Sequence, residues 1–255
     1  MALKFSVCIE MIFSDLPIEA RPKAVANAGY RAIEFWGWRN KDLTALLTAC
    51  EEAGVEIASF VCEAPGPLVD PANRAAWVDG AKESIDKAAE LGVRTLIVTT
   101  GNEIPGLSRW AQHDAIVSGL RAVASHAENS GVTLVLEPLN ILVDHKGYYL
   151  SSSREGFDIL RAVESPAVKL LYDIYHQQIT EGFLIQTIRD NIDLIGHFHV
   201  ADVPGRHEPG TGEINYANVF RAIEEAGYEG WVGLEFRPTG DSAEALRRVA
   251  EIAQR

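Results

Sequence analysis

The chain has 255 residues, of which 47% are hydrophobic and 23% are charged, as in an ordinary globular protein. Its formal net charge of −13 argues against a nucleic-acid partner or an anionic membrane surface. The three cysteines, Cys8, Cys50 and Cys62, have no CxxC spacing and indicate neither a disulfide framework nor a zinc knuckle. No apolar stretch approaches the roughly 18 residues of a membrane span and no leader pattern is recognised, so we expect a cytoplasmic protein.

Short runs rich in apolar and β-branched residues recur along the chain and predict eight strands. They are KFSVCIE (4–10), RAIEFWG (31–37), EIASFVCE (56–63), RTLIVTTG (94–101), TLVLEPLN (133–140), VKLLYDIY (168–175), LIGHFHVAD (194–202) and WVGLEFRP (231–238).

A stretch with helical periodicity follows each of these runs, and several end at a glycine, as helix C-termini often do. The stretches are 17–29, 42–54, 72–92, 109–131, 153–165, 183–193, 216–227 and 242–253. Asp42 is a plausible N-cap of the second stretch, which ends at Gly54.

Eight strand–helix units in about 250 residues predict a single (β/α)8 TIM barrel that spans residues 1–255 as one domain. Continuous apolar strands suit a parallel sheet buried on both faces. The alternative is an open doubly wound sheet, which would want a glycine-rich turn after the first strand. The segment IEMIFSDLP that follows that strand has no glycine.

The last four expected strands each carry a polar group near the carboxyl end, where barrel enzymes place their chemistry. The groups are Glu137 on the fifth strand, Asp173 and His176 on the sixth, His199 and Asp202 on the seventh, and Glu235 and Arg237 on the eighth. Buried carboxylates facing one cavity would repel each other without a cation. Three carboxylates and one imidazole suit Mn²⁺, Mg²⁺ or Co²⁺ better than a structural zinc ion.

The four candidate metal ligands also have purely structural alternatives. Glu137 or Glu235 could be a salt-bridged barrel residue, Asp173 could cap the helix that follows it, and His199 could be a hydrogen-bonded core histidine. Trp36, in the second expected strand, could form a substrate wall or pack in the core.

The seventh strand carries two histidines, His197 and His199, which point to the same side because residues i and i+2 of a strand share a face. Only the one nearer the carboxyl end easily joins a site, so we expect His197 to be a buried supporting group, with Asp202 in a similar role. The loop VPGRHEPGTGE (203–213) follows. Either it is an ordinary surface loop, or Arg206, with His207 or Glu208, leans over the cavity.

The segments YDIYH (172–176), HVADVPGRHEPGTGEINY (199–216) and GWVGLEF (230–236) resemble the hydroxypyruvate isomerase family. That family belongs to the larger xylose-isomerase-like barrel superfamily, which also contains the ketose 3-epimerases. The resemblance extends over essentially the whole chain and is most specific in the last two strands.

The resemblance implies one divalent metal ion, Mn²⁺ or Mg²⁺ before Co²⁺, held by Glu137, Asp173, His199 and Glu235. It implies that the two glutamates act as the acid/base pair. His176 corresponds to a contact with a substrate oxygen and Arg206 to a residue that steadies the substrate. From their positions in the sequence, we also expect Trp36 and Glu208 to contact the substrate. Superfamily relatives are often dimers or tetramers, so a homo-oligomer is consistent with the resemblance.

The expected activity is the metal-dependent isomerisation of a small α-hydroxy carbonyl compound, such as hydroxypyruvate to tartronate semialdehyde. A ketose 3-epimerase is the alternative, because His199 stands where a glutamine is expected in hydroxypyruvate isomerases and a histidine in the 3-epimerases. An endonuclease IV-like repair enzyme would need more metal-binding histidines and a basic face. A non-catalytic sugar-binding barrel would tolerate the loss of either glutamate.

Overall fold

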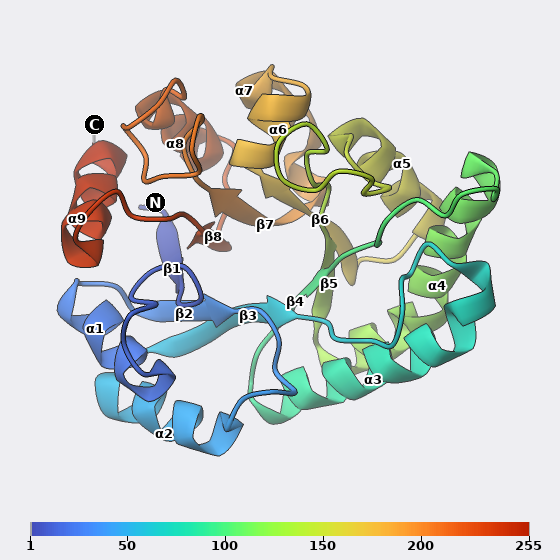
Figure 1. The fold of residues 1–255 in the computed structure, drawn as a ribbon, viewed down its shortest axis with the longest axis horizontal. Coiled ribbons are helices and arrows are strands. Elements are labelled where there is room, and N and C mark those ends of the chain that lie inside the picture. The colour runs from blue at the N-terminus through green and yellow to red at the C-terminus, as the bar shows by residue number, and fades with distance from the viewer. Residues whose placement is uncertain (1, 255) are drawn as a thin grey trace. The chain divides into compact units, whose positions relative to one another are not determined.

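The computed structural model describes residues 2–254, and within them eight strands follow one another as a closed barrel in the order β1 to β8 (Figure 1). Every pairing between neighbouring strands that is resolved is parallel. The predicted (β/α)8 barrel is therefore confirmed, and the open doubly wound alternative is wrong. No helix within residues 2–254 has the length and apolar character needed to cross a bilayer.

The strands are β1 (Lys4–Cys8), β2 (Ala32–Phe35), β3 (Glu56–Val61), β4 (Thr95–Val98), β5 (Thr133–Leu136), β6 (Val168–Asp173), β7 (Ile195–Val200) and β8 (Trp231–Leu234). The α-helices are α1 (Arg21–Asn27), α2 (Leu43–Ala53), α3 (Arg74–Glu90), α4 (Arg109–Ser130), α5 (Ser153–Val163), α6 (Ile174–Thr180), α7 (Leu184–Asn191), α8 (Tyr216–Glu225) and α9 (Ser242–Ala253). Short 3-10 turns lie at Ile18–Ala20, Pro71–Asn73 and Ile192–Leu194.

The expected strands begin within one residue of the observed ones, and the helix ends follow the capping signals. Asp42 accepts the backbone N–H of Ala45 at 3.0 Å, and Gly54 ends α2 in the left-handed region. Every expected strand runs two to four residues past the observed end, and the sixth was predicted to continue through Tyr175. The carboxylate of Asp173 instead accepts the N–H of His176 at 2.9 Å and begins α6.

The chain forms two compact units. The first unit comprises Met1–Phe60, Gly182–Ile192 and Phe198–Arg255. In it β1 pairs with both β2 and β8, β2 pairs with β3, and the last residues of β7 pair with β8. Helices α1 and α2 pack side by side, as do α8 and α9 (Figure 1). The rings of Phe35 and Phe60 stack at 5.3 Å in its core.

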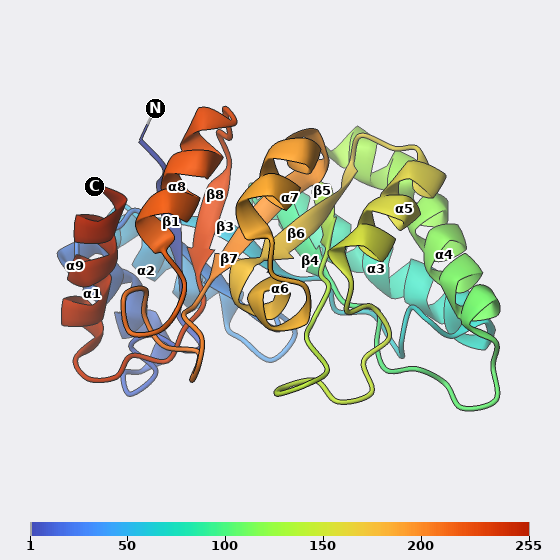
Figure 2. The ribbon, with the colours of Figure 1, turned by 90° about the horizontal axis from the view of Figure 1, so that it is seen from above.

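The second unit comprises Val61–Glu181 and Asp193–His197. Its sheet contains β4, β5 and β6 in sequence order. Helix α4 packs against α3 and against α5, and Figure 2 shows the three helices from above. Ile97, Val135 and Leu171, one from each strand, form a shared buried cluster.

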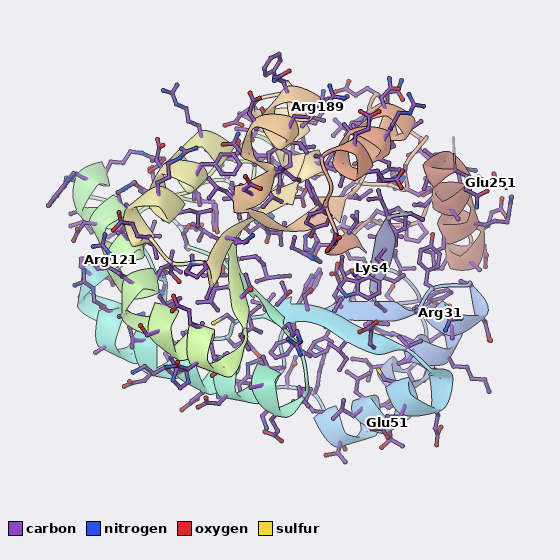
Figure 3. The ribbon with its side chains drawn as sticks, turned by 180° about the vertical axis from the view of Figure 1, so that it is seen from behind. Lys4, Arg31, Glu51, Arg121, Arg189 and Glu251 are labelled. Carbon is purple, nitrogen blue, oxygen red and sulfur yellow. The ribbon has the colours of Figure 1, made fainter. Side chains whose placement is uncertain are left out.

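Exposed charged side chains lie on the outer helices of each unit. Figure 3 labels Glu51 on α2, Glu251 on α9 and Arg121 on α4, and these side chains are exposed to solvent. Charges in such positions are solvated and contribute little to folding.

An ion cluster joins α4 to α5 in the second unit. Glu155 accepts a hydrogen bond from the Tyr149 hydroxyl at 2.7 Å and pairs with Arg109 and His113. The guanidinium of Arg109 also lies 4.3 Å from the ring centroid of Tyr149. Burial raises the pKa of Glu155, but the bonds from Tyr149, Arg109 and His113 outweigh it and hold that pKa below its usual value of 4.5.

Glu155 should therefore make the protein sensitive to acid. A carboxyl whose pKa is lower in the folded than in the unfolded chain stabilises the fold above the unfolded value, and this is lost as pH falls through the folded value. Glu155→Gln should lower the free energy of unfolding by about 1–3 kcal/mol at pH 7. It should also make the decline in stability below pH 4.5 shallower than in the parent. Urea unfolding from pH 7 to pH 3 measures both effects, with the exposed Glu51→Gln as control. Parallel curves for parent and Glu155→Gln would contradict the prediction.

Candidate active site

The second unit contains the carboxyl ends of β5 and β6. Glu137 follows β5 directly and is 6% exposed. Its backbone N–H donates to the carbonyl of Val98 at 3.0 Å, and its carbonyl accepts the Tyr148 hydroxyl at 3.1 Å. The backbone is thus fixed on both sides, so the side chain leaves the strand end in a defined direction.

Asp173 is the last residue of β6 and is buried. Its Oδ1 accepts the N–H of His176, which confirms the structural alternative of a helix cap. A carboxylate has two oxygens, however, and the cap engages only Oδ1. The other oxygen, Oδ2, lies 3.6 Å from Nε2 of His176. Capping and metal binding are therefore compatible for this side chain.

Asn140, a residue that sequence reasoning missed, sets which ring nitrogen of neutral His176 carries the proton. The side-chain oxygen of Asn140 accepts the N–H of Val143 at 2.9 Å, so its amide nitrogen must be the group that donates to Nδ1 of His176 at 2.7 Å. The backbone N–H of Asn140 also donates to this Nδ1, at 3.2 Å. Because Nδ1 accepts, neutral His176 carries its proton on Nε2. Nε2 is then the donor that His176 can offer to an oxygen.

The first unit contains Glu235, which follows β8 directly and is held at both oxygens. The indole N–H of Trp36 donates to Oε1 at 2.8 Å, and a guanidinium N–H of Arg206 donates to Oε2. Burial disfavours the charged form. Even so, the charge of Arg206 and the Trp36 N–H keep the pKa of Glu235 below its usual range. Glu235 is therefore a carboxylate at neutral pH. The structure brings together three residues that the sequence predicted for the site: Glu235, Arg206 and Trp36.

His199, on β7, lies between two carboxylates. Its Nδ1 is 3.4 Å from Oε2 of Glu235, and its Nε2 is 3.2 Å from Oε1 of Glu34. A neutral imidazole has one proton, so one of its nitrogens presents a lone pair to a carboxylate oxygen. Two acceptors at that separation repel unless a proton or a cation lies between them. This geometry fits a histidine that shares a cation with Glu235.

The loop after β7 is built around Asp202, which accepts hydrogen bonds from backbone N–H groups of the loop. Glu208 accepts hydrogen bonds from the backbone and hydroxyl of Thr239 and contacts Arg248 on α9. These contacts anchor the loop and do not support substrate binding by Glu208, which stays a prediction. His207 contacts the carbonyl oxygen of Arg237 at 2.7 Å. Arg206 is the loop residue whose side chain reaches Glu235.

His197 is 1% exposed and lies two residues before His199 on β7, which agrees with its expected burial. Its supporting role stays a prediction. Sequence reasoning also missed Glu34, which is buried on β2 beside Ser6 and Ser59. The available signal was the acidic residue inside the apolar run AIEF. Charged residues are rarely buried unless they are paired with another group or take part in function.

Cys8 lies near the same carboxylates, with Sγ 4.0 Å from Oε1 of Glu235. Burial, then the charges of Glu235 and Glu34, raise the pKa of this thiol well above its usual value. A thiol in such surroundings is neutral at physiological pH and is a poor nucleophile. Cys8 therefore fits the core position that the sequence predicted.

Glu137, Asp173, His199 and Glu235 share the chemistry of metal ligands: all four are buried, and each offers one oxygen or nitrogen. A closed parallel barrel with such groups at successive strand ends defines the class of (β/α)8 barrel enzymes. Within that class, the chain belongs to the xylose isomerase-like TIM barrel family, whose model matches residues 22–253. The predicted family resemblance is confirmed.

The similar proteins include two bacterial isomerases. The chain is 32% identical to a hydroxypyruvate isomerase of Escherichia coli over 96% of this chain and 97% of that protein. It is 30% identical to a 2-oxo-tetronate isomerase of Pectobacterium atrosepticum over 95% of each chain. A crystal structure described as an AP endonuclease, family 2, from Brucella melitensis has a TM-score of 0.93 at 28% identity and covers 98% of this chain and 99% of that one. The protein is an isomerase.

Proposed function

We propose that the protein isomerises a short 2-oxo acid that carries a hydroxyl group on the carbon next to the carbonyl. The two isomerases named above act, by their names, on hydroxypyruvate and 2-oxo-tetronate, and both of these are acids of this kind. The observation that carries the proposal is Glu235, a buried carboxylate held by Trp36 and Arg206 at a strand end of a barrel. Arg206 supplies the positive charge that suits an acidic substrate.

We further propose that Glu137, Asp173, His199 and Glu235 bind one divalent metal ion, with Mn²⁺ or Mg²⁺ preferred because oxygen ligands predominate. The close approach of Nδ1 of His199 to Oε2 of Glu235, at 3.4 Å, supports this, because a cation bound by both atoms would stabilise the pair. When bound, the ion would act as a Lewis acid towards the substrate carbonyl.

The chain's own residues would carry the proton transfer. Glu235 is ionised, so it can remove a proton from the hydroxyl-bearing carbon next to the carbonyl and leave an enediolate. A proton is then delivered to the former carbonyl carbon, and the hydroxyl proton moves between the two oxygens, so that no atom is gained or lost. In hydroxypyruvate this moves the carbonyl from C2 to C3 and gives tartronate semialdehyde. Glu137 is the second acid/base group, and His176 would donate its Nε2 proton to a substrate oxygen.

Proton NMR in D₂O tests the proposal directly. The protein is stripped of metal, then supplied with Mn²⁺, Mg²⁺ or Co²⁺, and offered hydroxypyruvate, 2-oxo-tetronate and a panel of ketohexoses. We expect metal-dependent conversion of a 2-oxo acid to its isomer, with deuterium on the newly protonated carbon. No conversion of either acid under any metal would overturn the substrate proposal.

The same experiment tests the alternative of a 3-epimerase, which His199 favours because those enzymes use histidine at this position. An epimerase would put deuterium on C3 of a ketohexose and form no aldose. That pattern, together with inert 2-oxo acids, would move the assignment from isomerisation to epimerisation.

A further inference from the structure

Glu34 is a buried carboxylate of the first unit, on β2, and it lies close to groups from neighbouring strands. Its Oε2 accepts hydrogen bonds from Ser6 on β1 at 3.1 Å and from Ser59 on β3 at 3.0 Å. Its Oε1 lies 3.2 Å from Nε2 of His199 on β7. The carboxylate is therefore held by two hydroxyl donors and lies against one imidazole ring.

The backbone of the neighbouring strands is shaped around this contact. The pairing of β2 with β3 skips Ala58, so that Ser59 lies opposite Glu34. Such irregularities re-aim side chains and are common beside active sites. On β8, Gly233 is paired with both Ser6 and His199. A Cβ at Gly233 would lie 2.2 Å from Oε1 of Glu34 and 2.7 Å from Cδ2 of His199, so only glycine leaves room for the pair.

We propose that Glu34 is a positioning residue that keeps the proton of His199 on Nε2 and so presents Nδ1 as a metal ligand. This inference rests on the proposed metal site. Oε2 of Glu235, the oxygen that lies 3.4 Å from Nδ1, already accepts a hydrogen bond from the cationic guanidinium of Arg206, which weakens its attraction for a second proton. Oε1 of Glu34 lies closer to the ring, 3.2 Å from Nε2 of His199. The electrostatically favoured place for the single imidazole proton is then Nε2. A carboxylate behind a metal-binding histidine raises its basicity and fixes its ring in the same way.

A merely structural role for Glu34 would make a different prediction. If Glu34 only compensated polar groups in the barrel interior, its loss would reduce stability and leave the His199 tautomer and the metal affinity alone. The two roles are therefore separated by measurements on the metal-free protein and on metal binding, neither of which depends on turnover.

The experiment compares the parent protein with Glu34→Gln and with Glu56→Gln, which removes an exposed carboxylate at the start of β3. The ¹⁵N shifts of the His199 ring are measured in metal-free protein, with the missing signals of His199→Gln providing the assignment. Mn²⁺ affinity is measured by electron paramagnetic resonance. We expect Nε2–H in the parent, loss of that preference in Glu34→Gln, and a Kd for Mn²⁺ about 10–100-fold higher. Glu56→Gln should match the parent in both measurements.

Gly233→Ala provides a second variant that keeps every proposed ligand and Glu34 itself. Its Cβ should push Glu34 and His199 apart and also raise the Kd for Mn²⁺, whereas Gly240→Ala, which has open space around its Cβ, should not. An unchanged tautomer and unchanged Mn²⁺ affinity in Glu34→Gln would overturn the inference, as would Nδ1–H in the parent. If Glu34→Gln does not fold, parent-like Mn²⁺ affinity in Gly233→Ala overturns it. Failure of the parent to bind Mn²⁺, Mg²⁺ or Co²⁺ would instead overturn the proposed metal site.

Discussion

Glu235→Gln should lower kcat by at least about 10²–10⁴-fold, the usual contribution of a positioned acid or base. The amide cannot take a proton from carbon at neutral pH. The substitution would also replace the carboxylate that accepts a hydrogen bond from Arg206 with an uncharged amide. In one of its two orientations, that amide would present an NH₂ group to Arg206. Steady-state kinetics with hydroxypyruvate or 2-oxo-tetronate measures the loss. Glu244→Gln, which removes an exposed carboxylate on α9, is the matched control and should keep the parental rate.

Two causes of that loss can be separated by varying the metal concentration. If Glu235 is only a metal ligand, saturating Mn²⁺ should restore turnover in Glu235→Gln. If it also transfers the proton, kcat should stay low at saturating Mn²⁺, and exchange of substrate protons with D₂O should stay slow. Turnover near that of the parent at ordinary Mn²⁺ concentration would contradict both roles. Glu235 would then be a structural residue of the barrel that forms a salt bridge.

The barrel could be predicted from the sequence because the local signals agree with the final fold. Apolar runs of strand length alternate with amphipathic stretches, and residues such as Asp42 and Gly54 begin and end a helix through backbone hydrogen bonds that are local. The boundary at Asp173 was missed for a related reason. The run VKLLYDIY is apolar enough for a strand throughout, and only the cap formed by the Asp173 side chain ends the strand at that residue.

The site was predictable only in part, because its ligands lie at strand ends whereas its supporting groups depend on pairing between distant segments. Glu235 and His199 could be found by asking what each strand carries at its carboxyl end. The contact of Glu34 with His199 joins residues far apart in the sequence, and it depends on the absence of a side chain at Gly233. Asn140 likewise acts through one nitrogen of His176, which no spacing in the sequence reveals.

Asp202→Ala should have the largest effect on stability, lowering the free energy of unfolding by about 3–5 kcal/mol. Asp202 is fully buried, and its two oxygens accept hydrogen bonds from five backbone N–H groups. These groups belong to Val203, Gly210, Thr211, Gly212 and Ile214, at distances of 2.8–3.1 Å. Bonds to a charged acceptor contribute about 1.5–3 kcal/mol each, but the sum is smaller because the opened loop is partly solvated. Urea unfolding measures the change, with the exposed Asp158→Ala as control.

The same variant tests whether the loop can open without the barrel. The amides of residues 210–212 and of Ile214 should exchange slowly with D₂O in the parent and much faster in Asp202→Ala, by about tenfold for each 1.4 kcal/mol lost. If the loop opens locally, amides in β8 keep their protection while Arg206, which lies on this loop, loses its fixed contact with Glu235. Activity would then fall although the barrel stays folded, and Asp202 would act on the site by holding Arg206 in place. Unchanged exchange of the loop amides would contradict this prediction. It would show that contacts other than those to Asp202 hold the loop closed.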